Sequence, residues 1–235
     1  MDWHKQQQDL AIILLNNLFP VYEEWLKVVQ EEVNIKWKKE ELQYPQRAKK
    51  EIENCIPNKS KVMHESFFAT YCKLHNRSVD HIDNYLYCYR VFKEARNCYI
   101  HRGGIADGRL VQAYRDYQQG KHNTCQALDV KEVPEFMEPI DGKQVNISLR
   151  GIVGFSYIII KLILSLETVL IEAPEAENFF IKKCKSQKIL APTLSGDEKK
   201  SQMQIKRFIA KCGFEKPNCV DVLKTLLLRE KLVSI

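Results

Sequence analysis

The chain has 235 residues, of which 45% are hydrophobic and 28% are charged, with only nine Gly and eight Pro. These values exclude a disordered, collagen-like or low-complexity protein and are typical of one globular domain, or of a main domain with a smaller appendage. The net charge of +6 is unevenly distributed: Ala176 to Ile235 contain 13 basic and 6 acidic residues, whereas the preceding part of the chain is nearly neutral.

Apolar residues spaced by three and four predict amphipathic helices in the first half of the chain. We expect these helices over residues 10–33, 62–74, 79–100 and 107–118. Pro20 predicts a kink or a break in the first of them, because proline removes a backbone donor and clashes with the preceding turn. Gly103 and Gly104 predict a turn after the third, since adjacent glycines are unfavourable inside a helix.

The second half contains a turn signal and a long apolar segment. Asp141-Gly142 stands between two short alternating runs, which predicts a β-hairpin over about residues 135–148. The segment 149–170 after it is long enough to span a bilayer, but Lys161 near its middle costs about 2.5–3.5 kcal/mol there. We therefore expect a buried core helix and no membrane contact. Three further helices are predicted over residues 176–185, 197–212 and 219–231.

These elements predict an all-α fold with two parts. Residues 1–172 form a helical domain that includes the small hairpin, and residues 173–235 form a basic helical appendage. The appendage is compatible with a winged-helix-like reader of nucleic acid, with an extra layer packed on the bundle, or with a contact for a partner protein.

The eight cysteines are dispersed and form no Cys-x-x-Cys pair, which argues against a zinc site. Met1 to Asp9 is polar and lacks the features of a secretory signal. We therefore expect free thiols and a cytoplasmic location. The sequence also lacks a phosphate-binding glycine loop, a Gly-x-Ser-x-Gly elbow and a His-Glu-x-x-His motif, so no cofactor or metal is expected.

The segment from Glu94 to Asp107 carries the most specific chemistry. Arg96 is suited to holding a phosphate through its planar fork of donors. His101 is suited to proton transfer near neutral pH. Together they suit metal-free cleavage of RNA, in which the ribose 2′-hydroxyl attacks the adjacent phosphorus and a cation stabilises the charge that develops.

The spacing of this pair limits how a site can form. Five residues of α-helix rotate by roughly 500°, which puts Arg96 and His101 about 140° apart around a continuous helix. Either the helix ends or distorts near His101, or a symmetric second copy of the chain completes the site.

The segment Arg96-Asn-Cys-Tyr-Ile-His101, preceded by Glu94 and followed by Gly-Gly, resembles the Arg-x4-6-His motif of HEPN-domain proteins. The resemblance covers roughly residues 1–172 and is strongest to the larger variants of bacterial toxin and defence systems. It implies a helical bundle that dimerises with two motifs facing each other, and a metal-independent endoribonuclease acting in toxin–antitoxin or antiphage defence. It also implies an antitoxin or regulatory protein as a further partner.

For individual residues, the resemblance implies that Arg96 and His101 are catalytic and that Asn97 orients the phosphate or the arginine. Some HEPN toxins have a tyrosine two positions after the histidine, which a partner nucleotidyltransferase modifies. This chain has Gly103 at that position, which argues against the same form of control.

Plainer interpretations of these residues stay open. Arg96 could pair with Glu94 or Asp107 as an ordinary surface cation, and His101 could be a helix-terminal histidine favoured by the helix dipole. Asn97 could simply satisfy a helix end.

Two flanking cations and two other functions also stay open. Lys93 and Arg102 could bind RNA phosphates or could be solvated charges. The protein could be a non-catalytic HEPN module that binds RNA, a nucleotide or a partner protein. It could also be a DNA-binding regulator that uses residues 197–231.

Overall fold

The computed structural model describes residues 3–38, 41–45, 47–56, 58–74, 79–119, 122–187 and 189–235. Most of these residues are helical. Extended pairing among them is limited to two isolated bridges, Ile105–Gln144 and Thr193–Ser234. The predicted all-α fold class is therefore confirmed.

The predicted helices are present; most ends differ by a few residues from those expected, and the first helix begins seven residues earlier, at Trp3. In chain order the elements are α1 (Trp3–Val28), η1 (Val29–Val33), η2 (Glu41–Gln43), α2 (Arg47–Cys55), α3 (Lys61–Met63), η3 (His64–Phe68), α4 (Ala69–Lys73), η5 (Val79–His81), α5 (Ile82–Arg102), α6 (Gly108–Gln119), α7 (Leu149–Leu170), α8 (Pro174–Ser186), α9 (Glu198–Lys211) and α10 (Asp221–Arg229). Helix α1 runs through Pro20 without ending there.

Contacts group the chain into two compact units. The first contains residues 1–28, 37–51 and 79–165, and the second contains residues 29–36, 52–78 and 166–235. Helix α7 begins in the first unit and ends in the second. The division at residue 172 expected from the sequence stays a prediction.

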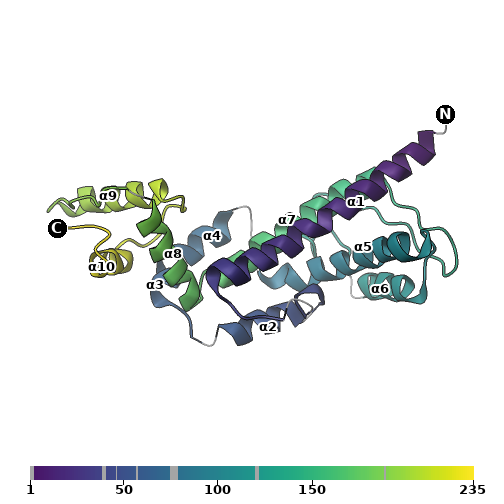
Figure 1. The fold of residues 1–235 in the computed structure, drawn as a ribbon, viewed down its shortest axis with the longest axis horizontal. Coiled ribbons are helices and arrows are strands. Elements are labelled where there is room, and N and C mark those ends of the chain that lie inside the picture. Colours follow the sequence, from purple (N-terminus) through teal and green to yellow (C-terminus); the bar gives the residue numbers. More distant parts are fainter. Residues whose placement is uncertain are drawn as a thin grey trace. The chain divides into compact units, whose positions relative to one another are not determined.

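The first unit is built around aromatic side chains from three helices. Phe155 of α7 stacks on Phe92 of α5 with ring centroids 4.2 Å apart. Phe19 of α1 contacts Phe155 at 5.4 Å and Tyr89 of α5 at 5.1 Å. Helix α6 packs along α5 as the second arm of a helical hairpin (Figure 1). Because Tyr89 and Phe92 are buried, these rings stabilise the core and are not available to stack on bases.

The turn at 141–142 forms, but the hairpin expected over 135–148 is not confirmed. The backbone N–H groups of Gly142 and Val145 donate to the carbonyls of Ala106 and Gly104, at 3.0 and 2.8 Å. These donors are satisfied by the segment that follows α5 and not by residues 135–140. The turn therefore packs against the segment at the C-terminal end of α5.

Helix α7 combines an apolar composition with one buried charge. Among the described residues it is the helix long and apolar enough to cross a membrane, and half of its most apolar stretch is buried within the protein. The Lys161 side chain is only 7% exposed, and its ammonium pairs with the carboxylate of Asp129. The absence of membrane contact stays a prediction.

The second unit has its own apolar core. Helices α8, α9 and α10 bury side chains against α3 and η3, including a ring contact of 5.6 Å between Phe67 and Phe180. Phe214 also contacts Phe180, at 4.8 Å. The basic helices of the appendage thus share one core with residues 61–73.

Candidate functional site

One face of α5 carries a chain of polar contacts that leads to the motif. Arg90, Glu94, Asn97 and His101 follow one another at spacings of three and four, so they lie along one side of the helix. Glu94 is 2% exposed and pairs with Arg90, and it also accepts a hydrogen bond of 3.2 Å from the Asn97 amide. Asn97 is therefore held by Glu94, and His101 is exposed one turn further on.

Arg96 lies on another side of the same helix. Helix α5 is continuous to Arg102 and ends at Gly103, whose φ is +60°. Arg96 and His101 are therefore about 140° apart around the axis. The guanidinium carbon of Arg96 lies 5.3 Å from the centre of the Phe19 ring, and its buried Nε has no hydrogen-bond partner. A single chain does not bring the two groups together.

The acidic residues near the motif are bound to other cations. Glu94 pairs with Arg90, and Asp107 pairs with Arg102 at 2.5 Å. The expected alternative, in which Arg96 pairs with Glu94 or Asp107, is not found. Within the part of the chain that the structure describes, Arg96 and His101 have no ion-pair or hydrogen-bond partner.

Both flanking cations are engaged in contacts. The Lys93 ammonium binds the side-chain oxygen of Gln43, and burial, followed by the charge of Arg90, lowers the pKa of Lys93. Arg102 is bound to Asp107. Lys93 and Arg102 therefore bind RNA only if they exchange these partners.

The turn after α5 fixes the end of the motif. The N–H of Gly104 donates to the carbonyl of Cys98 at 3.0 Å. A Cβ at Gly104 would lie 2.7 Å from the ring of Tyr99. The Tyr99 hydroxyl in turn donates to the carbonyl of Val145. Close packing of Tyr99 against Gly104 holds the last turn of α5 in place.

Three isoleucines in or beside the segments that follow the motif are exposed. Ile100 is 48% exposed, Ile105 is 38% exposed, and Ile140, in the turn that is hydrogen-bonded to Ala106, is 63% exposed. Exposed large apolar side chains that gather in one region mark surfaces for protein contact.

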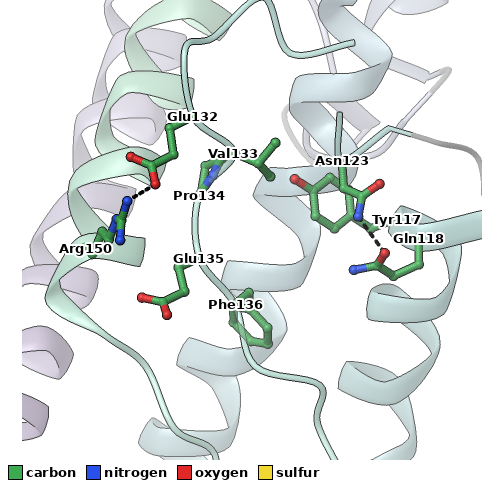
Figure 2. A pocket seen from close by; sticks show the side chains of 9 residues that line it. All are labelled: Tyr117, Gln118, Asn123, Glu132, Val133, Pro134, Glu135, Phe136 and Arg150. Carbon is green, nitrogen blue, oxygen red and sulfur yellow. Dashed lines mark hydrogen bonds and ion pairs between the residues drawn. The ribbon is translucent and has the colours of Figure 1, made fainter. Parts of the chain in front are cut away.

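A hollow of about 440 Å³ lies beside the start of α7 (Figure 2). Two pairs of its polar side chains bind each other: Arg150 pairs with Glu132, and Asn123 donates to Gln118 at 2.5 Å. The Glu135 carboxylate, which also lines the hollow, accepts a hydrogen bond from the Ser148 hydroxyl.

A second pocket, of about 520 Å³, lies between α5, α6 and the residues Tyr44, Pro45 and Arg47, and the sequence did not predict it. Its charged and aromatic lining includes Tyr44, Arg47, Tyr87, Arg90, Arg109 and Asp116. The signal was present as arginine and tyrosine residues close together in the sequence. The pairing of residues 44–47 with α5 could not be seen from local spacing.

No group of three or more His, Cys, Asp or Glu side chains that could hold a metal ion occurs among the described residues. The seven cysteines whose side chains are described are free thiols, as predicted, and Cys55 lies outside that set. Burial raises the pKa of the Cys88 thiol to about 12, so it is unreactive near neutral pH.

The motif therefore offers a permanent cation and an imidazole on two sides of one helix, and Ile100, next to the imidazole in the sequence, is exposed. Comparison with known proteins finds no matching family model, curated protein or solved structure.

Proposed function

We propose that this protein is a metal-independent endoribonuclease of the HEPN type, which acts as a homodimer in toxin–antitoxin or antiphage defence. The observation that carries the proposal is that Arg96 and His101 have no ion-pair or hydrogen-bond partner among the described residues, while the neighbouring acids are neutralised by Arg90 and Arg102. A guanidinium and an imidazole that are not bound to a carboxylate are the groups that an anionic phosphodiester requires.

In the proposed reaction, His101 of one chain removes the proton from a ribose 2′-hydroxyl. The resulting oxygen attacks the adjacent phosphorus, and the bond to the 5′-oxygen breaks. The partner subunit's His101 donates a proton to that leaving oxygen. Arg96 stabilises the charge on the phosphate oxygens. The products are a 2′,3′-cyclic phosphate and a free 5′-hydroxyl, and DNA is not cleaved because it lacks the attacking group.

A second copy of the chain supplies what one chain lacks. Because α5 is continuous, Arg96 and His101 of one chain lie too far apart around the helix to grip one phosphate from the same side. The exposed Ile100 and Ile105 beside His101 provide an apolar surface on which two copies can meet. Asn97, whose amide is held by Glu94, is proposed to orient the phosphate.

The test is incubation of the purified protein with total tRNA and with a structured RNA in the presence of EDTA. The variant is His101→Ala, and the matched control is His81→Ala at the other end of the same helix, where the side chain makes no capping hydrogen bond. We expect discrete fragments with 2′,3′-cyclic phosphate ends from the wild type and the control. Loss of a general acid–base lowers the rate by about 10²–10⁴-fold. Undiminished cleavage by His101→Ala would contradict the proposal.

The second candidate function is a non-catalytic HEPN module that binds RNA, a nucleotide or a partner protein. The separation of Arg96 from His101 within one chain favours it, because binding requires no joint action of the two groups. This alternative predicts binding without turnover, and a larger loss of affinity in Arg96→Ala than in His101→Ala.

A further inference from the structure

The pocket between α5, α6 and residues 44–47 contains more positive than negative charge. Arg47, Arg90 and Arg109 line it together with one carboxylate, Asp116. Asp116 accepts a hydrogen bond of 2.7 Å from Gln112. The volume, about 520 Å³, lies within the range of about 300–1,000 Å³ that is usual for small-molecule sites.

Stacking on an aromatic ring positions two of these arginines. The guanidinium carbons of Arg90 and Arg47 lie 4.6 and 5.1 Å from the centre of the Tyr44 ring. Cation–π contacts of this kind hold the plane of the guanidinium and leave donors at its edge. Arg90 also pairs with Glu94, whereas Arg47 and Arg109 have no carboxylate partner among the described residues.

Tyr87 adds a second aromatic ring to the pocket. One face of this ring stacks on His122, with centroids 3.9 Å apart and planes 10° apart. His122 is itself fixed by a 2.6 Å hydrogen bond to Asn84. A tyrosine supported on one side in this way is a rigid platform for a flat ligand on the other side.

We infer that this pocket binds a nucleotide unit, with its phosphate at Arg47, Arg90 and Arg109 and its base against Tyr87. Arginine forks match phosphate oxygens, and aromatic rings accept any base. Asp116 can accept a hydrogen bond from a ribose hydroxyl or a base amino group. A nucleotide unit satisfies the arginines and the rings together, which a simple anion or an apolar ligand does not.

The site lies on the same face of α5 as His101. Tyr87, Arg90, Glu94, Asn97 and His101 are spaced by three and four residues, and Arg90 is about 16 Å from His101 along the helix axis. That the nucleotide unit belongs to an RNA substrate rests on the proposed function. A ribonuclease would bind here a nucleotide that flanks the cleaved bond of its single-stranded substrate. The binding itself does not depend on cleavage.

The test measures fluorescence anisotropy of a labelled, 2′-O-methylated single-stranded RNA of twelve nucleotides, which cannot be cleaved through a 2′-hydroxyl. Competition with AMP and UMP tests free mononucleotides as the source. The variants are Arg109→Gln, Arg47→Gln and the double variant. Arg115→Gln is the matched control, because Arg115 is exposed on α6 outside the pocket. Circular dichroism confirms that each variant is folded.

We expect each single variant to weaken RNA binding by about tenfold, since hydrogen bonds to charged groups are being lost. The slope of log K against log salt concentration should fall by about 0.7 for each phosphate contact removed. If AMP or UMP competes with the labelled RNA, the ligand is a free nucleotide. If neither competes, the ligand is an RNA strand. Either result supports a nucleotide site.

Equal affinity of the double variant and the Arg115→Gln control, for the RNA and for both mononucleotides, would overturn the inference. Failure of the proposed function gives a different result: the wild type would not cleave RNA, while the pocket variants would still lose binding.

Discussion

At the scale of single residues, the proposed function depends on which charged side chains near the motif are paired with each other. The arginines at positions 90 and 102 neutralise Glu94 and Asp107. Without them, the same carboxylates would be available to bind Arg96 or His101 and to repel a phosphate. In the proposed function, these pairs leave Arg96 and His101 available to a phosphate.

The two glycines after the motif should differ in their sensitivity to substitution. Gly103 has φ of +60° and open space around its Cβ position, whereas Gly104 has φ of +84° and a Cβ position 2.4 Å from the Gln144 amide nitrogen and 2.7 Å from the Tyr99 ring. Both alanine variants incur left-handed strain of about 1–2 kcal/mol. Gly104→Ala adds overpacking of about 1–3 kcal/mol.

Urea denaturation followed by circular dichroism measures this difference. We expect Gly104→Ala to lower the free energy of unfolding clearly more than Gly103→Ala does. Equal losses in the two variants would mean that Tyr99 and Gln144 yield easily and do not fix the end of α5.

At the scale of helices, the sequence predicted what depends on local spacing. The apolar periodicity placed α1, α5, α6 and α7 correctly because each helix buries one face and its hydrogen bonds are local. The glycine pair correctly predicted the turn after α5.

The features that the sequence did not predict are contacts between distant segments. The sequence predicted the turn at 141–142 but not its hydrogen bond to Ala106. An Asp-Gly pair indicates a turn, but it does not indicate which distant segment the turn will pair with. The pocket was missed for the same reason: Tyr44 meets Arg90 only through the tertiary fold. For the motif, the positions of Arg96 and His101 around the helix followed from the 3.6-residue repeat.

The ion pair between Lys161 of α7 and Asp129, which precedes that helix in the chain, gives a prediction at the scale of the helix. Lys161 is buried, whereas the Asp129 side chain is 37% exposed. Asp129→Asn leaves a buried ammonium without its counter-charge and should lower the free energy of unfolding by on the order of 2 kcal/mol. Lys161→Met leaves a carboxylate that water can reach, so it should lower the free energy of unfolding by less than Asp129→Asn does.

Chemical denaturation of the two variants beside the wild type tests this order. A larger loss in Lys161→Met than in Asp129→Asn would show that packing of the lysine stem, and not its charge, determines the contribution of this pair.

At the scale of the whole molecule, the proposed activity requires two chains. One chain has one His101, and the proposed reaction uses a base and an acid at the same time. Ile100, Ile105 and Ile140 are exposed apolar side chains in the motif and in the segments that pack after it, and we propose that they contribute to the contact between two chains. Association at this contact would bury the apolar side chains and bring two copies of the motif together.

Mixing wild-type and inactive chains tests this requirement directly. Wild-type and His101→Ala chains are combined in equal amounts, allowed to exchange subunits, and assayed for RNA cleavage at constant total protein. If the two histidines of a symmetric dimer share the base and acid roles, only dimers of two wild-type chains are active. Activity should then fall to about one quarter of that of the undiluted wild type. Chains that act alone would retain about one half. Mixtures with His81→Ala should remain fully active, because that variant keeps the motif intact and exchanges in the same way.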